Sequence, residues 1–272
     1  MGMTAADLLE DGQPYWRLYT LPEALDFYRT VLDSCADDPY THREWRRRLV
    51  LTDLFYLLVY ELNRPDAAHP WLYARCREVE NDPDGVINLW AREHYKSSII
   101  TFAQNIQEIL KNPQVTIGLI SHTKAIAEDK FLAPIKTELE TNPNLYYLFP
   151  EVLYENPDTQ SPHWNASEIQ VKRTGTIKEK TIEAHGIMDG MPTGSHFDIL
   201  HYDDLITEKH VTSPEMVKKA TANWELSLSL GKEGGRQRYV GTFYAMQDTY
   251  STIIERGAAR PRAPHRVAIA PA

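Results

Sequence analysis

The chain has 272 residues, with 29 basic and 38 acidic side chains and a formal net charge of −9. This length suits one large α/β domain or two modest ones, and the acidic balance excludes a protein that coats nucleic acid with its whole surface, so any DNA contact has to be local. Cys35 and Cys76 are too few for a disulfide framework, and the longest apolar run, LFYLLVY, is far shorter than the roughly 20 residues of a membrane helix, so we expect no membrane association.

Residues 1–80 are expected to form a helical subdomain, because apolar side chains recur at helical spacing behind helix-capping patterns. Thr20 and Glu23 form one capping box, and Thr41 and Glu44 form a second that leads into a long apolar helix. The second helix also carries a basic cluster, Arg43, Arg46, Arg47 and Arg48. Such a cluster is either the solvated face of a helix or a local contact with nucleic acid.

Residues 81–256 alternate between short apolar strands and amphipathic helices, which is typical of a mostly parallel sheet with crossover helices. The expected strands are residues 86–90, 115–120, 197–202 and 238–241. The expected helices are residues 98–110, 124–140 and 213–230. Prolines and turn formers predict a long excursion over residues 142–165, followed by a hairpin with strands near residues 169–173 and 181–185.

The segment LWAREHYKSSII, residues 89–100, has the pattern of a phosphate-binding loop without its glycines. In G-x-x-x-x-G-K-[ST] the last two residues lie between a strand and a helix; Lys96 and Ser97 fit, whereas Trp90 and Tyr95 replace the glycines. At a helix N-terminus the N–H groups and the helix dipole favour an anion, so Lys96 would reach the outer phosphates of a nucleotide and Ser97 would hold Mg²⁺. Arg92 adds a second cation. The alternative is an ordinary helix start.

Two further motifs end predicted strands. FDILHYDD delivers two carboxylates: Asp203 would help to hold Mg²⁺, and Asp204 would orient and activate the attacking water. In VGTFYAMQDTY the hydroxyl of Thr242 would lie near the γ-phosphate. Each motif alone also fits an ordinary strand end. Because ligands bind at the carboxyl ends of the strands in such sheets, the three motifs together predict a nucleotide site.

Other catalytic signatures are weaker. His196, His201 and Asp203 lie close in sequence, but no Cys/His pairs have zinc-finger spacing. The chain also lacks a G-x-S-x-G or Cys-His nucleophile signature. We therefore expect the histidines to be core or surface residues and not metal ligands.

The same motifs carry a resemblance to the large subunits of phage terminases over roughly residues 85–250. REHYKS is similar to the divergent phosphate loop of that family, which often lacks the first glycine and keeps an arginine, here Arg92, four residues before the lysine. LISHT is similar to the second strand of the family, and GSHFDILHYDDL resembles its Walker B segment. GTFYAMQDTY resembles its coupling motif, a Gly-Thr with an Asp-x-Tyr further on.

The resemblance implies a RecA-like (ASCE P-loop) ATPase core at residues 81–256 behind the helical subdomain of residues 1–80. A motor of this family hydrolyses ATP with Mg²⁺ and pumps double-stranded DNA into a viral prohead. It acts as a homo-oligomeric ring on the portal protein, together with the small terminase subunit, in the cytoplasm of the infected bacterial host. Residues 257–272 would be a linker toward a nuclease domain that this chain lacks, so we expect no nuclease activity.

The resemblance also implies roles for single residues. The nucleotide would be bound by Arg92, Glu93, His94, Tyr95, Lys96, Ser97 and Ser98. The metal would be held by Ser97 and Asp203, and the catalytic side chains would be Lys96, Asp204, Arg92, Thr242 and Arg173. Two positions depart from the family, since Tyr95 replaces the usual glycine and Asp204 stands where many members have glutamate. Glu208 is an alternative base.

Several alternatives stay open at this point. Arg173, on the predicted hairpin, is either an arginine finger that acts in trans within a ring or a solvent-facing side chain, and Arg236 and Arg238 are rival fingers. The chain would otherwise be another P-loop phosphotransferase, such as a small-molecule kinase, or a non-catalytic scaffold that binds nucleotide or nothing. Stimulation of hydrolysis by DNA separates the translocase from the kinase, and absence of ATP binding selects the scaffold.

Overall fold

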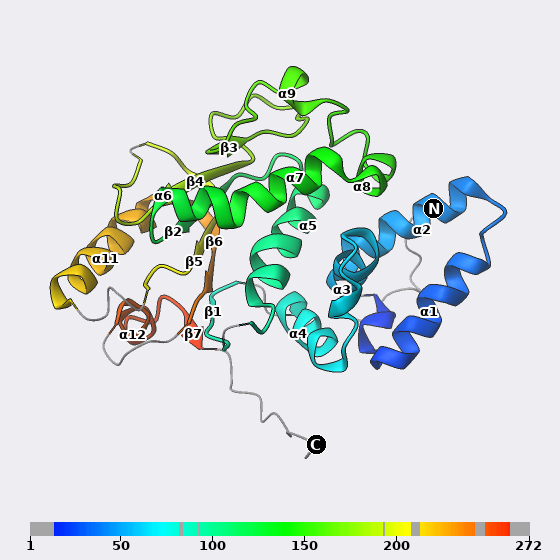
Figure 1. Cartoon of the computed structure of the whole chain (residues 1–272), viewed down its shortest axis with the longest axis horizontal. Helices are drawn as coiled ribbons and strands as arrows, with labels where there is room; N and C mark the ends of the chain where they lie inside the picture. The colour runs from blue at the N-terminus through cyan, green and yellow to red at the C-terminus, as the bar shows by residue number, and fades with distance from the viewer. Residues whose placement is uncertain are drawn as a thin grey trace, which may run out of the picture.

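A seven-stranded sheet with strand order β3-β4-β2-β5-β6-β1-β7 forms the centre of the fold (Figure 1). The computed structural model describes residues 14–81, 84–91, 93–192, 194–207, 213–242 and 248–261. The strands are β1 (Val86–Asn88), β2 (Ile117–Ser121), β3 (Glu168–Ile169), β4 (Ile182–Gly186), β5 (Phe197–Asp203), β6 (Gly231–Val240) and β7 (Arg260–Pro261). Neighbouring strands run parallel, except β3 and β4, which are antiparallel. The α/β fold with a mostly parallel sheet, which the sequence predicts, is confirmed.

Two strands differ from expectation. β6 begins at Gly231, earlier than the start predicted near residue 238. The first half of the strand is polar, contains glycines and is largely exposed, so it lacks the apolar run from which a buried strand is predicted. The predicted hairpin is only half right. Ile169 pairs antiparallel with Ile182, but β3 has two residues and the other edge of β4 pairs in parallel with β2. β4 is therefore an interior strand of the main sheet.

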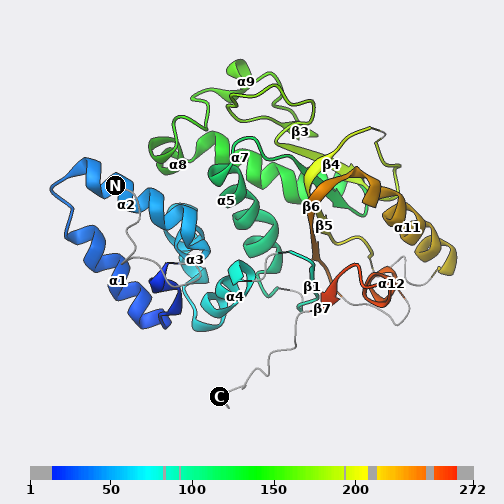
Figure 2. The same ribbon diagram turned by 180° about the vertical axis from the view of Figure 1, so that it is seen from behind.

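Helices cover both faces of the sheet (Figures 1 and 2). One face carries η5 (Ser97–Ala103), α5 (Gln104–Lys111), α6 (Lys124–Ile126), η6 (Ala127–Leu132) and α7 (Ala133–Thr141). The other carries α11 (Pro214–Ser227), η7 (Leu228–Leu230) and α12 (Thr249–Glu255). The helices expected at residues 98–110, 124–140 and 213–230 are confirmed, although η5 and η6 are π-helical turns. The excursion after residue 142 contains α8 (Pro143–Leu148) and α9 (Pro157–Gln160).

The alternation of side chains along β5 decides which residues face the first set of helices. Ile199 packs in the core shared with η5 and α5, whereas Leu200 and Tyr202 pack in a second core with α11 and α12. His201 and Asp203 share the face of Ile199. The strand therefore delivers Asp203 beneath the helix that begins at Ser97.

The N-terminal region is helical, as predicted. Its elements are η2 (Tyr15–Leu18), α1 (Leu21–Asp33), α2 (Pro39–Thr52), α3 (Leu54–Tyr56), η3 (Leu57–Glu61), η4 (Pro65–Ala67) and α4 (Pro70–Asn81). The capping box of Thr20 and Glu23 is present, but the one predicted at Thr41 is wrong, because Asp38 caps α2. Apolar side chains of this region join the core around α5. No helix in the ranges described above is long and apolar enough to cross a membrane.

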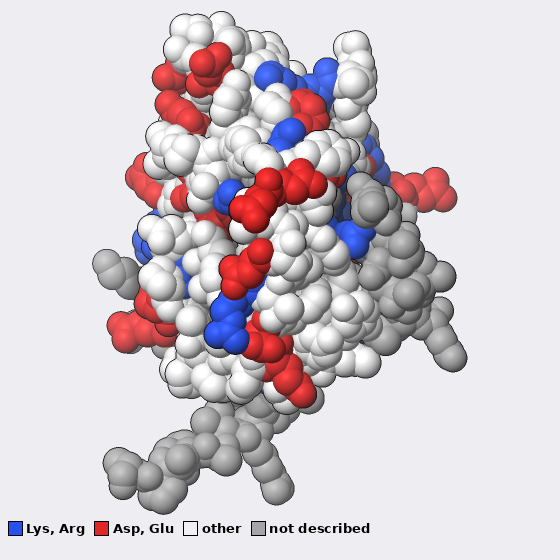
Figure 3. All heavy atoms as spheres, turned by 90° about the vertical axis from the view of Figure 1, so that its right-hand side faces the viewer, with Lys and Arg blue, Asp and Glu red and all other residues white. Residues whose placement is uncertain are grey.

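The basic cluster on α2 is engaged within the chain. Arg46 forms two hydrogen bonds to the buried carboxylate of Glu61, at 2.9 and 2.6 Å. Arg47 pairs with Glu151 at 2.6 Å, and Arg43 donates to the carbonyl of Leu148 at 3.1 Å. On the face of the molecule that carries α1 and α2, acidic and basic side chains are interspersed (Figure 3). The cluster thus fastens α2 to the segment around α8 and does not form a continuous basic patch.

Candidate functional site

The carboxyl ends of β1, β6 and β5 lie side by side at one edge of the sheet. Asn88 of β1 and Asp203 of β5 both pair with Val240 of β6. The residues that follow these strand ends, including the loop that leads to Lys96, are therefore brought together. They meet at the edge where open α/β sheets bind their ligands.

Lys96 makes the contact that joins the first motif to the third. Its side chain is buried, and Nζ donates to the hydroxyl of Thr242 at 2.7 Å and to the carbonyl of Trp90 at 3.5 Å. The two partners belong to different elements, since Trp90 follows β1 and Thr242 follows β6. Neither of these two partners is an acid, and a buried ammonium without an acidic partner favours an anion as its ligand.

The backbone of the loop takes left-handed conformations at two residues that are not glycine. Glu93 has φ +64° and Tyr95 has φ +60°. Such a conformation costs an L-residue about 1–2 kcal/mol, and Tyr95 occupies the second glycine position of the phosphate-loop pattern. The hydroxyl of Tyr95 donates to the carboxylate of Asp66, next to α4, and the ring of His94 meets that of Trp71 edge-on at 5.5 Å. Side chains of the loop are thus anchored to the helical region.

Asp203 is fully buried at the end of β5. Its Oδ2 accepts a hydrogen bond from the hydroxyl of Thr101. Burial and the neighbouring Asp204 raise the pKa of Asp203 to about 8, against hydrogen bonds from Thr101 and Ser97 and the charge of Lys96, which lower it. Ser97 and Asp203, the two predicted metal ligands, are therefore in contact.

The site fits a hard cation. Within the residues that the structure describes, Oδ1 of Asp203 and Oδ1 of Asp204 are buried and accept no hydrogen bond. Two adjacent carboxylates with unsatisfied buried oxygens favour a positive partner. No three His, Cys, Asp or Glu side chains among the described residues are grouped to hold a metal ion. Mg²⁺ would suit this arrangement, because it takes one or two protein ligands and completes its shell with water and phosphate oxygens.

Tyr250 links the acid pair to the Gly-Thr motif. Asp204 has φ +49°, and its N–H donates to the carbonyl of Val240 at 3.0 Å. The buried hydroxyl of Tyr250 accepts from the N–H of Leu205 at 3.0 Å and donates to the carbonyl of Val240 at 3.4 Å. A Cβ on Gly241 would lie 2.3 Å from that hydroxyl, so only glycine fits there. The Tyr250 hydroxyl thus joins the Gly-Thr motif to the segment that follows the acid pair.

Thr101 was missed from the sequence, and His201 was expected only to be a core or surface histidine. Thr101 bridges Asp203 and His201, whose Nε2 lies 3.0 Å from the Thr101 hydroxyl. Burial, with a smaller effect of Arg238, lowers the pKa of His201 to about 3, so the ring is neutral and donates to Thr101 while Thr101 donates to Asp203. Helical i,i+4 spacing from Ser97 and strand i,i+2 spacing from Asp203 would have identified both.

Some predicted residues are not brought to this edge. Arg173 donates to the carbonyls of Glu179 and Val115 at 2.7 and 3.1 Å and to the hydroxyl of Thr181 at 3.0 Å. Val115 and Thr181 precede β2 and β4, so Arg173 lies at the amino edge of the sheet, away from the site of its own chain. An action in trans stays a prediction. Arg92 and Glu208 lie outside the described residues.

The rival arginines are held in an internal ion-pair network. Arg238 is buried and pairs with Asp84 and Glu108, each at 2.8 Å, and Arg236 pairs with Glu108 at 2.9 Å. Burial alone would raise the pKa of Glu108, but Arg238 and Arg236 outweigh it and lower the pKa to about 2. These contacts connect β6 to α5 and to the start of β1, which gives both arginines a structural role.

No protein-family model matches this chain, and no curated protein is similar enough in sequence to be matched. The case for a function therefore depends on the geometry of the site. That geometry comprises a buried lysine on a loop between strand and helix, a hydroxyl from the next strand end, and an acid pair from the one after it.

Proposed function

We propose that the protein is a Mg²⁺-dependent ATPase with a RecA-like (ASCE P-loop) core of the terminase large-subunit type. The observation that carries the proposal is the bond of 2.7 Å between Lys96 Nζ and Thr242 Oγ1, beside the contact of Ser97 with Asp203. Three sequence motifs, each weak alone, supply these four side chains. Their convergence at the ligand-binding edge of the sheet favours the nucleotide site over three unrelated strand ends.

Each residue has a role in this proposal. Lys96 and the N–H groups of the loop bind the phosphates, with the helix N-terminus contributing its dipole. Ser97 and Asp203 would hold Mg²⁺, which neutralises charge on the phosphates. Asp204 activates the attacking water, and the buried strand end holds its carboxylate close to Asp203. Thr242 releases Lys96 when phosphate arrives and then bonds to the γ-phosphate itself.

The further step, to a DNA-packaging motor, is supported by the order of the motifs. The segments that resemble the phosphate loop, the Walker B segment and the coupling motif all reach the same edge, and Tyr250 connects the last two. A motor needs a link between the hydrolysing groups and other elements, and this contact provides one. Double-stranded DNA, the portal protein and the small terminase subunit would be its partners, with the chain acting as a ring.

One experiment tests both the ATPase activity and the DNA-packaging motor. The rate of ATP hydrolysis would be measured with and without double-stranded DNA, for the wild type, for Lys96→Ala and for the matched control Lys218→Ala, an exposed lysine on α11. We expect hydrolysis that DNA stimulates, that Lys96→Ala abolishes and that Lys218→Ala leaves unchanged. Absence of hydrolysis would refute the proposed ATPase activity. Hydrolysis at the same rate with and without DNA would refute the motor and favour a kinase.

A further inference from the structure

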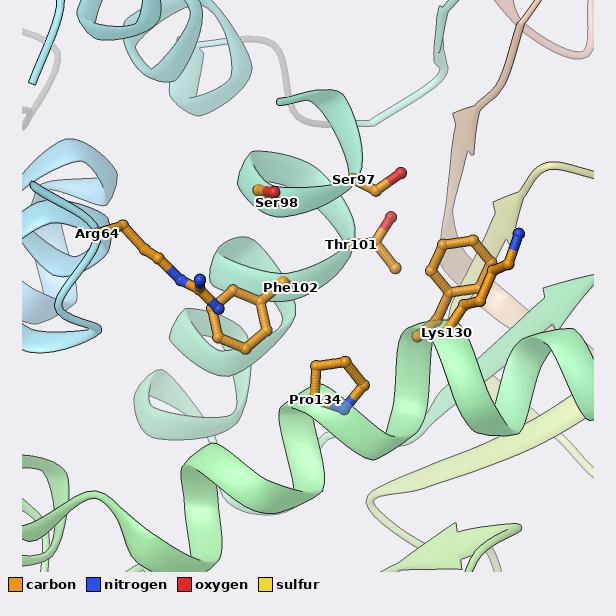
Figure 4. Close-up of a pocket in the computed structure, with 8 residues that line it drawn as sticks. Arg64, Ser97, Ser98, Thr101, Phe102, Lys130 and Pro134 are labelled. Atoms are coloured by element: carbon orange, nitrogen blue, oxygen red, sulfur yellow. The ribbon is translucent and has the colours of Figure 1, made fainter. Parts of the chain in front are cut away.

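A second polar feature lies beside the candidate nucleotide site. A pocket of about 160 Å³ opens between η5 on one side and η6 and the start of α7 on the other (Figure 4). Its lining contains two cations, Arg64 and Lys130, and three hydroxyl side chains, Ser97, Ser98 and Thr101. Phenylalanine and proline side chains complete the wall. Figure 4 shows the hydroxyls of Ser97 and Thr101 directed toward the side from which Lys130 approaches.

The two cations are not neutralised by ion pairs. In the part of the chain that the structure describes, neither Arg64 nor Lys130 forms a salt bridge. Arg64 lies over the ring of Phe102 at 5.4 Å, which fixes its guanidinium at the pocket. Of the nearby acids, Glu128 pairs with Lys124 at 3.6 Å. Glu138 lies near enough for Arg64 to lower its pKa against the larger effect of burial, but in the described residues it forms no salt bridge with Arg64 and accepts a hydrogen bond from Asn142.

The pocket and the candidate nucleotide site share residues. Ser97 lines the pocket and lies close enough to Asp203 to lower its pKa, and Thr101, from the next turn of the helix, lines the pocket and donates a hydrogen bond to Asp203. The pocket therefore adjoins the metal side of the candidate site. The volume corresponds to about five water molecules at about 30 Å³ each and falls below the roughly 300–1,000 Å³ of pockets that hold drug-sized ligands. This size suits a small oxyanion.

We propose that this pocket binds inorganic phosphate after it has been cleaved from the nucleotide. The inference rests on the proposed ATPase function. Arg64 would supply charge-assisted hydrogen bonds to the phosphate oxygens from one side, and Ser98 a hydroxyl from the helix. Lys130 is exposed, and its ammonium, which Figure 4 shows directed away from Arg64, would turn toward the pocket to bind the anion from the other side. Since Arg64 belongs to the connector before η4 and Lys130 to η6, bound phosphate holds these two segments against η5, and its departure releases them.

The test measures phosphate binding without hydrolysis. Inorganic phosphate is titrated into the nucleotide-free protein by calorimetry at low ionic strength. The samples are the wild type, the double variant Arg64→Met/Lys130→Met, the loop variant Lys96→Ala and the control Lys136→Met on α7. We expect the double variant to weaken binding by about tenfold or more, as loss of charged hydrogen bonds implies. Lys136→Met should stay within about twofold of the wild type, and Lys130→Arg should retain binding. Lys96→Ala should remove only binding at the loop and leave the part of the binding that the double variant removes.

Two results would overturn the inference: no phosphate binding by the wild type, or binding that Lys96→Ala abolishes and the double variant retains. The second result would place the anion on the loop. The thermal midpoint of each variant shows whether it is folded, and the single variants replace the double one if it is not. Because the titration needs no ATP, phosphate binding by a chain that hydrolyses nothing would refute the proposed function and leave the pocket intact.

Discussion

Replacing Tyr95 by glycine and, in a matched variant, by alanine tests whether the loop holds the backbone conformation seen here. Both variants lose the hydrogen bond to Asp66, so that loss cancels in the comparison. At φ +60° alanine bears about 1–2 kcal/mol of strain that glycine does not, whereas the greater freedom of glycine in the unfolded chain costs about 0.4–1 kcal/mol. The glycine variant should therefore be more stable than the alanine variant, by up to about 1.5 kcal/mol.

The free energy of unfolding in urea measures this difference, with equal m-values as the sign that the unfolded states are comparable. The neighbouring residue His94 is the control, because it is not among the residues with positive φ. There the alanine variant should be the more stable, by about 0.4–1 kcal/mol. If alanine is the better residue at position 95 as well, the left-handed loop and its likeness to a phosphate loop are wrong.

Three further outcomes follow from the site and its surroundings. Lys96→Ala should lower the rate of hydrolysis by about 10²–10³-fold or more without unfolding the protein, and unchanged turnover would exclude the loop from the mechanism. Asp204→Asn should bind ATP with Mg²⁺ but not hydrolyse it, whereas Asp203→Asn should lose the metal dependence of binding; equal effects on binding would show that the two roles are not separate. The pKa of Glu108 falls from 4.5 to about 2 on folding, so its ion pairs contribute about 3 kcal/mol above pH 4.5 that is lost as the pH falls toward 2. Glu108→Gln should flatten this part of the curve of unfolding free energy against pH, and an unchanged slope would refute the assignment.

Strand ends and helix starts around the site could be read from the sequence because they depend on local patterns. The apolar run before Asp203 and the helical spacing after Ser97 each fix one element, and parallel pairing brings their ends together. The course of β6 before Arg238 could not be read in this way, because polar residues and glycines carry no apolar period. Nor could the place of β4, since its alternating pattern fits a surface hairpin as well as an interior strand with one less covered face.

Contacts between distant residues were beyond reach for a different reason. Arg46 pairs with Glu61 and Arg47 with Glu151. These contacts depend on how α2 packs against the core, which no local sequence pattern encodes. The same holds for Arg173. Its place on a predicted hairpin left open an arginine finger or a solvent-facing side chain, and did not show that its guanidinium bonds to the backbone at the amino edge of the sheet. Charged residues in a sequence show that charge is present, and only packing decides whether it faces a partner or the chain itself.

The anchoring of the loop explains how it can dispense with glycine. A glycine loop reaches left-handed conformations without strain, but it has no side chains with which to fix itself. Here Tyr95 bonds to Asp66 and the ring of Trp71 contacts both His94 and Trp90, at 5.5 and 5.8 Å, so the helical region stabilises the strained backbone. The strained backbone and its anchor therefore depend on the same side chains. If the loop binds phosphate as proposed, the bound anion would act on the helical region through these contacts.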